Sequence, residues 1–322
     1  KIINMTSIIA FDFKTKQLHE NYQIHEVKSV IEQGYYLWLD LTPHDLSDCI
    51  ELLESLNIDV SALEPNEECE WLSYFDHYLE FTLRETTDEL SEQVAKIVQV
   101  ILAENVMVTI DFYGAVFMQK MRLSYRDDFI KVAKTPGFLL FELADHLISQ
   151  FHKTLRVFAA HNKLLQKKMF EEVEETVFNE ASIMINDLLN FRRILLGTDE
   201  IFDELSTRKC SLIAETAQTG LHIKSSRLEI LSRELLNERD SLTSSLNLYL
   251  GMMSYRTSKI MHRLTGFSII FLPLGFLVGL YGMNFSFMPE LKWDHGYLYF
   301  WGLVGLVFVI LFVLGRRGRW WH

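Results

Sequence analysis

Three kinds of feature are scarce in this sequence of 322 residues, and each absence argues against a class of protein. The three cysteines, Cys49, Cys69 and Cys210, are scattered and form no Cys-x-x-Cys pair, so neither a disulfide framework nor a thiolate zinc site is expected. There is no glycine-rich phosphate loop, no Gly-x-Ser-x-Gly and no His-Glu-x-x-His, which are motifs of common enzyme classes. A formal net charge of −12 argues against nucleic acid as a partner, because phosphate contacts need a basic surface.

Charge is missing altogether from Leu264 to Pro289. A second apolar run, Tyr297–Gly315, follows after a short polar segment. Each run is long enough to cross a hydrocarbon core, which needs ~20 mostly apolar residues. The sequence therefore predicts a multi-pass protein of the cell inner or plasma membrane, with two transmembrane helices at 264–283 and 297–315 that form a hairpin in the lipid bilayer.

Basic residues flank the two spans and predict their orientation. Three stand before the first span and three follow the second, whereas the connecting loop carries one net negative charge. Cytoplasmic flanks are the ones enriched in Lys and Arg, so we expect both termini in the cytoplasm, with residues 316–322 as a basic tail. The six flanking residues are Arg256, Lys259, Arg263, Arg316, Arg317 and Arg319.

Residues 1–135 are predicted to form a cytoplasmic α/β domain. Thr42 or Asp45 can cap a helix that continues through Leu56. Glu104-Asn105 is a plausible hairpin turn between two apolar runs. Four segments rich in β-forming residues predict strands, namely Ser7–Phe13, Tyr35–Leu41, Trp71–Thr86 and Ala95–Asp111.

Proline is absent from Gly137 to Leu272, where apolar residues recur at helical spacing. This pattern predicts long cytoplasmic helices and a stalk over 136–263. Breaks are expected at Gly197, where Gly-Thr-Asp can end one helix and begin the next, and at Gly220.

The last of these helices is predicted to continue into the first span. Beyond Gly220 nothing clearly stops a helix before Tyr281, and Pro273 can be accommodated in a membrane helix as a kink. Such a helix is ~90 Å long at 1.5 Å per residue. A helix of that length needs neighbours, which indicates an oligomer.

Acidic residues cluster twice on the predicted cytoplasmic helices. They form either a solvated face or a weak sensor of Mg²⁺ or Ca²⁺, cations that favour carboxylate oxygens. The eleven histidines are scattered and form no recognisable ligand set. The acidic residues are Glu171, Glu172, Glu174, Glu175, Asp199, Glu200, Asp203 and Glu204.

One face of the first span carries small, apolar or hydroxyl side chains and no charge. Steps of three and four residues place them on one stripe of a helix. The stripe either packs against other helices, since Gly275-x-x-x-Gly279 permits close approach, or lines a pore shared by several subunits. In a pore, the bulky residues would form apolar constrictions that gate by dewetting. The stripe consists of Met261, Leu264, Thr265, Ser268, Leu272, Gly275 and Gly279.

A pore without charge cannot strip a divalent cation of its water, and Mg²⁺ gives up its shell reluctantly. The ion would therefore move largely hydrated and be recognised through its waters. Asn284, just beyond the span, is the polar residue placed for this, because its amide oxygen can accept hydrogen bonds from those waters. Gly282 would allow the turn that points nearby carbonyls inward.

The segment Tyr281-Gly282-Met283-Asn284-Phe285, followed by Met288-Pro289-Glu290-Leu291, resembles the signature of CorA-type divalent-cation channels. The flanking residues of the hairpin agree with that family, and the N-terminal part agrees in layout. The resemblance implies a funnel-shaped homopentamer in which the first span lines the pore and the second surrounds it. It implies inward movement of Mg²⁺, often also Co²⁺ and Ni²⁺, with Mg²⁺ between subunits holding the channel closed, and no organic cofactor.

Residue by residue, the resemblance implies an outer selectivity ring of Gly282, Met283 and Asn284. It also implies a hydrophobic gate at Met261, Leu264 and Leu272. Two positions depart from many relatives, which have asparagine at the position of Ser258 and threonine at that of Gly275. Either difference could alter inner ion binding or the width of the gate.

Two other interpretations stay open. A ZntB-like, proton-coupled Zn²⁺ transporter shares this architecture, although the loop Phe285–Leu291 favours Mg²⁺ and no His or Cys lines the stripe. A membrane-tethered enzyme or adaptor would use the hairpin only as an anchor. The absence of the common catalytic motifs argues against that second interpretation.

Overall fold

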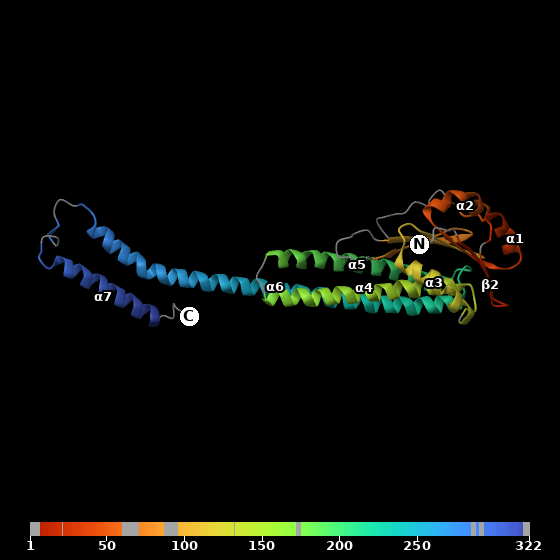
Figure 1. The fold of residues 1–322 in the computed structure, drawn as a ribbon. Coiled ribbons are helices and arrows are strands. Elements are labelled where there is room, and N and C mark those ends of the chain that lie inside the picture. The colour runs from red at the N-terminus through yellow and green to blue at the C-terminus, as the bar shows by residue number, and fades with distance from the viewer. Residues whose placement is uncertain are drawn as a thin grey trace. The chain divides into compact units, whose positions relative to one another are not determined.

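The computed structural model describes residues 7–20, 22–59, 71–86, 96–131, 133–171, 175–284, 288–289 and 293–317. The chain divides into two compact units, Lys1–Ser245 and Leu246–His322 (Figure 1). The boundary falls within one long helix, α6, so this helix contributes to both units.

A seven-stranded sheet forms the core of the first unit, in the order β2-β1-β3-β7-β6-β5-β4. Neighbouring strands are antiparallel except for β3 and β7, which pair in parallel. The strands are β1 (Ser7–Asp12), β2 (Gln17–Glu20), β3 (Tyr36–Leu41), β4 (Leu72–Tyr74), β5 (Tyr78–Glu85), β6 (Lys96–Ala103) and β7 (Val106–Asp111).

Helices cover both faces of this sheet, so its central strands are buried at every position (Figure 1). Side chains alternate between the two faces. Leu37 and Leu39 of β3 join one apolar core with α1 (Val27–Glu32) and α2 (Pro43–Ser55). Trp38 points the other way, and its ring lies 5.3 Å from that of Tyr125 on α3 (Val116–Lys131). A short 3-10 helix, η1 (Ile24–Glu26), precedes α1.

Local signals predicted much of this unit correctly. Thr42 is the N-cap of α2, and Asp45 completes a capping box with it. The hairpin at Glu104-Asn105 is confirmed between β6 and β7. The single strand predicted over Trp71–Thr86 is wrong, because a turn closed by the Phe75 N–H and the Tyr78 carbonyl, 2.9 Å apart, divides it into β4 and β5.

Three long helices follow the sheet, namely α4 (Gly137–Glu171), α5 (Glu175–Thr207) and α6 (Glu215–Tyr281). Within the first unit α4, α5 and the start of α6 run side by side (Figure 1). The Asn162 amide of α4 donates to the Glu238 carbonyl and carboxylate of α6 at 3.1 and 2.6 Å. The predicted helix start at Gly137 and end at Tyr281 are both confirmed.

The predicted breaks at Gly197 and Gly220 are wrong. Gly197 lies inside α5, where the neighbouring Thr198 hydroxyl donates back to the Ile194 carbonyl at 2.9 Å instead of capping a new helix. Gly220 lies inside α6, where a methyl group would come within 3.0 Å of the Phe141 ring. Its small size therefore serves the packing of α6 on α4 rather than a turn.

The second unit consists of the C-terminal part of α6 and α7 (Gly296–Arg317), which lie side by side (Figure 1). By length and composition, α6 and α7 are the two described helices that could cross a membrane. The Tyr281 and Phe300 rings, 5.2 Å apart, join the end of α6 to the start of α7. α6 continues through Pro273, as predicted for a membrane helix.

Candidate ion-conduction site

The six residues proposed to line a pore lie on the C-terminal part of α6, which belongs to the second unit, and share one face. At about 100° of rotation per residue, they fall within an arc of about 80°. All six are exposed, and Leu272 keeps 74% of its surface accessible. We call these residues the α6 stripe: Met261, Leu264, Ser268, Leu272, Gly275 and Gly279.

The opposite face of α6 is the one covered within the second unit. Gly266 and Ile270 are buried there, and Pro273, Leu274 and Leu277 are half-buried. On α7 the covered positions recur every three or four residues, which marks a single helix face in contact. They are Gly296, Phe300, Leu303, Val304, Val307, Leu311 and Gly315. The unit therefore leaves the α6 stripe free for other molecules.

The two glycines of the stripe have no packing role within the described part of the chain. A methyl group at Gly275 or at Gly279 would meet no described atom within 4 Å. A glycine costs a helix interior roughly 0.5–1 kcal/mol relative to alanine. If these two positions have to be small, the reason is either a neighbouring helix that packs against them or an open channel beside them.

The stripe offers almost no ligand for a dehydrated cation. The Ser268 hydroxyl donates to the Leu264 carbonyl of its own helix at 3.0 Å. The other five side chains are apolar or absent. An ion passing along this face would keep its water.

Asn284, the polar residue proposed to contact the water of the ion, lies just beyond the C-terminal end of α6. α6 ends at Tyr281, and the Gly282 N–H still donates to the Val278 carbonyl at 3.0 Å. Met283 and Asn284 follow with exposed side chains. Phe285 and Glu290–Leu291 of the resembling segment lie outside the described residues.

The role predicted for Gly282 needs correction. Its φ is not positive, so the turn does not use the conformational freedom that only glycine has. A methyl group at this position would lie 3.1 Å from the Val278 carbonyl oxygen. Gly282 therefore leaves room for the close approach of the backbone to the end of α6, where a larger residue would force a small shift.

The two acidic clusters do not form a site in the described part of the chain. Glu171, Glu200 and Asp203 are exposed, as a solvated face requires. Asp199 is half-buried and accepts a hydrogen bond from the Ser225 hydroxyl at 2.7 Å, and burial raises its pKa. The side chains of Glu172, Glu174 and Glu175 lie outside the described residues.

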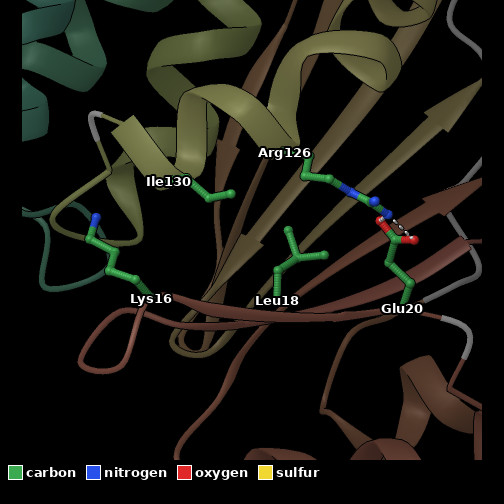
Figure 2. Close-up of a pocket in the computed structure, with 5 residues that line it drawn as sticks. All are labelled: Lys16, Leu18, Glu20, Arg126 and Ile130. Atoms are coloured by element: carbon green, nitrogen blue, oxygen red, sulfur yellow. Dashed lines mark hydrogen bonds and ion pairs between the residues drawn. The ribbon is translucent and has the colours of Figure 1, made fainter.

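A pocket of about 260 Å³ lies between β2 and α3, and an ion pair forms part of its lining (Figure 2). The Arg126 guanidinium donates to both oxygens of Glu20 at 2.6 Å, and the Tyr125 hydroxyl donates to the same carboxylate. These contacts hold the pKa of Glu20 below its usual value. Lys16, Leu18 and Ile130 complete the lining, and we assign the pocket no site.

Among the described residues, one group of possible metal ligands was not predicted from the sequence. α3 and α4 bring together Asp128, Glu142 and His146, with one ligand atom of each within 4.8 Å of the others. The only sequence signal was Glu142-x-x-x-His146, a spacing that places both side chains on one helix face. Asp128 comes from the preceding helix, which local sequence does not reveal.

The family of the chain follows from comparison with known proteins. The family described as CorA-like Mg²⁺ transporter protein matches residues 33–317, which include strands β3 to β7, the long helices and both apolar helices. The chain belongs to this family. Cobalt/magnesium transport protein CorA of Thermotoga maritima is 27% identical over 254 residues, covering 77% of this chain and 72% of the relative.

Solved structures agree on the fold. The complete structure of the CorA magnesium transporter from Methanocaldococcus jannaschii matches with a TM-score of 0.83, at 16% identity, over 99% of this chain and 100% of that one. The ZntB cytoplasmic domain from Vibrio parahaemolyticus matches with a TM-score of 0.52, at 11% identity, over 79% of this chain and 98% of that domain. The α/β domain, the long helix and the C-terminal apolar helix thus have the fold of the complete CorA structure, and the cytoplasmic domain of ZntB shares this fold over 79% of the chain.

Family membership makes the chain a CorA-like divalent metal transporter with two apolar helices that fit a two-span membrane protein. Members of this family are transporters, in agreement with the prediction that the chain is not an enzyme. The α6 stripe and the Gly282-Met283-Asn284 segment both lie within the matched residues.

Proposed function

We propose that the chain is the subunit of a homopentameric channel for hydrated Mg²⁺, also permeable to Co²⁺ and Ni²⁺. The observation that carries this proposal is the uncharged, exposed α6 stripe, which leads directly to Gly282-Met283-Asn284. The names of the relatives support magnesium and cobalt as cargo. No organic cofactor is proposed.

Selection is proposed to act on the water around the ion. Five copies of Asn284 form a ring whose amide oxygens accept hydrogen bonds from waters of the first shell. Mg²⁺ is suited to this mode because it holds its waters tightly. Gly282 and Met283 shape the ring, and Gly282 does so by keeping the backbone close to the end of α6.

Gating is proposed to occur below the ring. Met261, Leu264 and Leu272 expose large apolar side chains on the stripe. Where five such residues converge, the channel becomes narrow and apolar, and water leaves it. A hydrated ion cannot pass a dry segment, so small movements of α6 open or close the path.

The proposal also includes the orientation of the chain in the membrane. Both termini lie in the cytoplasm, with 1–135 and 136–263 as the cytoplasmic α/β domain and stalk, 264–315 as the transmembrane hairpin and 316–322 as the tail. The basic residues that flank the two spans support this orientation. The membrane potential then drives divalent cations inward, by about 2.3 kcal/mol per charge per 100 mV.

Asn284→Ala tests the selectivity ring. We expect the variant to assemble as the wild type does, because Asn284 is exposed and forms no hydrogen bond with described residues. Mg²⁺ flux into proteoliposomes should fall at least tenfold, since the ring loses its hydrogen-bond acceptors. Oligomer mass is measured in parallel by native mass spectrometry.

The matched control is Asn237→Ala, which removes an exposed asparagine from α6 outside the predicted span and away from the face of the stripe. It should leave flux unchanged. The proposed role of the ring would be contradicted if Asn284→Ala kept the wild-type Mg²⁺ flux with the oligomer intact.

A further inference from the structure

We propose that Asp128, Glu142 and His146 form a binding site for a divalent transition-metal cation within a single chain. The site lies in the first unit, where α3 packs against α4. It is separate from the α6 stripe and from the Gly282-Met283-Asn284 segment, which belong to the second unit. The cation class is Zn²⁺, Co²⁺ or Ni²⁺ rather than Mg²⁺.

Two packed helices supply the three ligands, one from α3 and two from α4. Ser124 and Asp128 are four residues apart on α3, and Glu142 and His146 are four residues apart on α4, so each pair lies on one helix face. The ring contact between Phe129 of α3 and Phe138 of α4, with centroids 6.2 Å apart, fixes the two helices beside the cluster. Ligands held on packed helices are positioned before the metal arrives.

The ligand atoms already face one another. The His146 Nε2 lies 3.5 Å from a Glu142 carboxylate oxygen and 2.8 Å from the Ser124 hydroxyl. One ligand atom of Asp128 lies within 4.8 Å of those of Glu142 and His146. A cation at the centre of such a triangle is within reach of all three with small side-chain movements.

Lysine and arginine do not neutralise the two carboxylates of the cluster in the described part of the chain, and the basic side chain in contact with Glu142 is His146 itself. No lysine or arginine among the described residues forms an ion pair with Asp128 or Glu142. The side chain of Glu142 is only 14% exposed and Asp128 is half-buried, so water screens the two carboxylates incompletely. A bound cation would relieve this repulsion.

The two carboxylates and the imidazole of the cluster determine which metal ions it favours. Mg²⁺ and Ca²⁺ favour oxygen ligands, whereas an imidazole nitrogen suits Zn²⁺, Co²⁺ and Ni²⁺. Two carboxylates with one histidine are a mixed set of the kind that binds zinc and its neighbours. The site therefore distinguishes transition metals from Mg²⁺ by the nitrogen of His146.

The full-length chain in detergent, stripped with a chelator, is titrated with Co²⁺ while its visible absorption is recorded. Ligation by imidazole changes the absorption bands of Co²⁺ relative to the hydrated ion. We expect one such Co²⁺ per chain, displaced by Zn²⁺ but not by a tenfold excess of Mg²⁺. Asn284→Ala should give the same spectrum, so a failure of the conduction proposal leaves this result unaffected.

His146→Gln and Asp128→Asn should each weaken Co²⁺ binding by on the order of a hundredfold, because each removes a direct ligand. The matched controls are His152→Gln on α4 and Asp127→Asn on α3, which change exposed neighbours of the same residue types and should bind as the wild type does. Without metal, Asp128→Asn should melt at or above the wild-type temperature, because it removes a repelling charge.

Three outcomes would overturn the site. These are a Co²⁺ spectrum in His146→Gln identical to that of the wild type, displacement of Co²⁺ by Mg²⁺ at equal concentration, and a large loss of metal-free stability in Asp128→Asn. The last would mean that this carboxylate has a structural partner in the chain.

Discussion

Glu80 lies in the middle of β5 with 1% of its surface exposed, beside the equally buried Gln99 of β6. The Gln99 amide donates to one Glu80 oxygen, and burial raises the pKa of Glu80 to about 7. The Gln99 side-chain oxygen has no hydrogen-bond partner among the described residues. A protonated Glu80 has an O–H to donate to it, so the neutral acid completes the pair.

This pair predicts how the stability of the first unit depends on pH. The folded chain keeps a proton on Glu80 that the unfolded chain releases near its ordinary value of 4.5. Stability is therefore lost as pH rises from about 4.5 to about 7. Glu80→Gln removes the ionisation, and its amide N–H can donate to Gln99.

We expect Glu80→Gln to melt several degrees above the wild type at pH 8 and at the same temperature at pH 5, in thermal denaturation of the full chain. Glu104→Gln, which changes an exposed carboxylate in the β6–β7 turn, should have no effect at either pH. A melting temperature of Glu80→Gln below the wild-type value at pH 8 would show that the ionised form is the one the fold requires.

The sequence predicts single residues well where the chemistry is local. Asn284 stands out because it is the polar side chain that follows a long uncharged run. The Glu80–Gln99 pair could not be found in this way, since the register of β5 on β6 brings these residues together. The same holds for Asp128 and His146, which meet only after α3 packs on α4.

At the scale of elements, the C-terminal part of α6 has one covered face and one exposed face. The face around Ile270 is covered within the second unit, and the α6 stripe is not. This asymmetry allows substitutions on the stripe to test conduction without disturbing the packing of the single chain.

Leu272→Ser should raise the leak of Mg²⁺ in the closed state several-fold. Leu272 is the most exposed large side chain of the stripe, and a hydroxyl there would let water remain in the constriction. Leak is measured as dye-reported Mg²⁺ entry at high internal Mg²⁺. Val309→Ser on α7 is the control and should not leak. If leak in Leu272→Ser equals that of the wild type, the constriction lies elsewhere.

Gly279→Leu should abolish flux while leaving the fold of the single chain intact. A Cβ atom at Gly279 would meet no described atom within 4 Å, so we expect the added side chain to act on a neighbouring subunit or on the pore. The control is Gly305→Leu on α7, where the space is equally open but the position is proposed to face away from the pore. Wild-type flux in Gly279→Leu would remove this face of α6 from the conduction path.

The elements themselves were predictable in part. The continuation of α6 as far as Tyr281 was predictable, because no clear stop signal interrupts the helix before that residue. The breaks expected at Gly197 and Gly220 failed because glycine costs a helix only ~1 kcal/mol, which burial of neighbours such as Leu195 and Phe202 outweighs. Whether a glycine ends a helix therefore depends on packing partners that are distant in sequence.

At the scale of the whole molecule, one chain presents the exposed α6 stripe but cannot by itself enclose an ion. The hairpin of α6 and α7 covers one side of α6 and leaves the other open. Several copies arranged around an axis would join their stripes into a closed path and bring the Asn284 residues into a ring. The proposed pentamer is the assembly that the family resemblance implies.

The most direct test of the channel proposal is ion entry into proteoliposomes, with voltage and pH gradients set separately and Mg²⁺, Co²⁺ and Zn²⁺ compared. The proposal predicts Mg²⁺ entry that follows an inside-negative voltage and does not respond to pH, because a hydrated ion moves passively through an uncharged path. Zn²⁺ entry that follows the pH gradient, with little Mg²⁺ entry at any voltage, would contradict it and indicate a ZntB-like, proton-coupled zinc transporter instead.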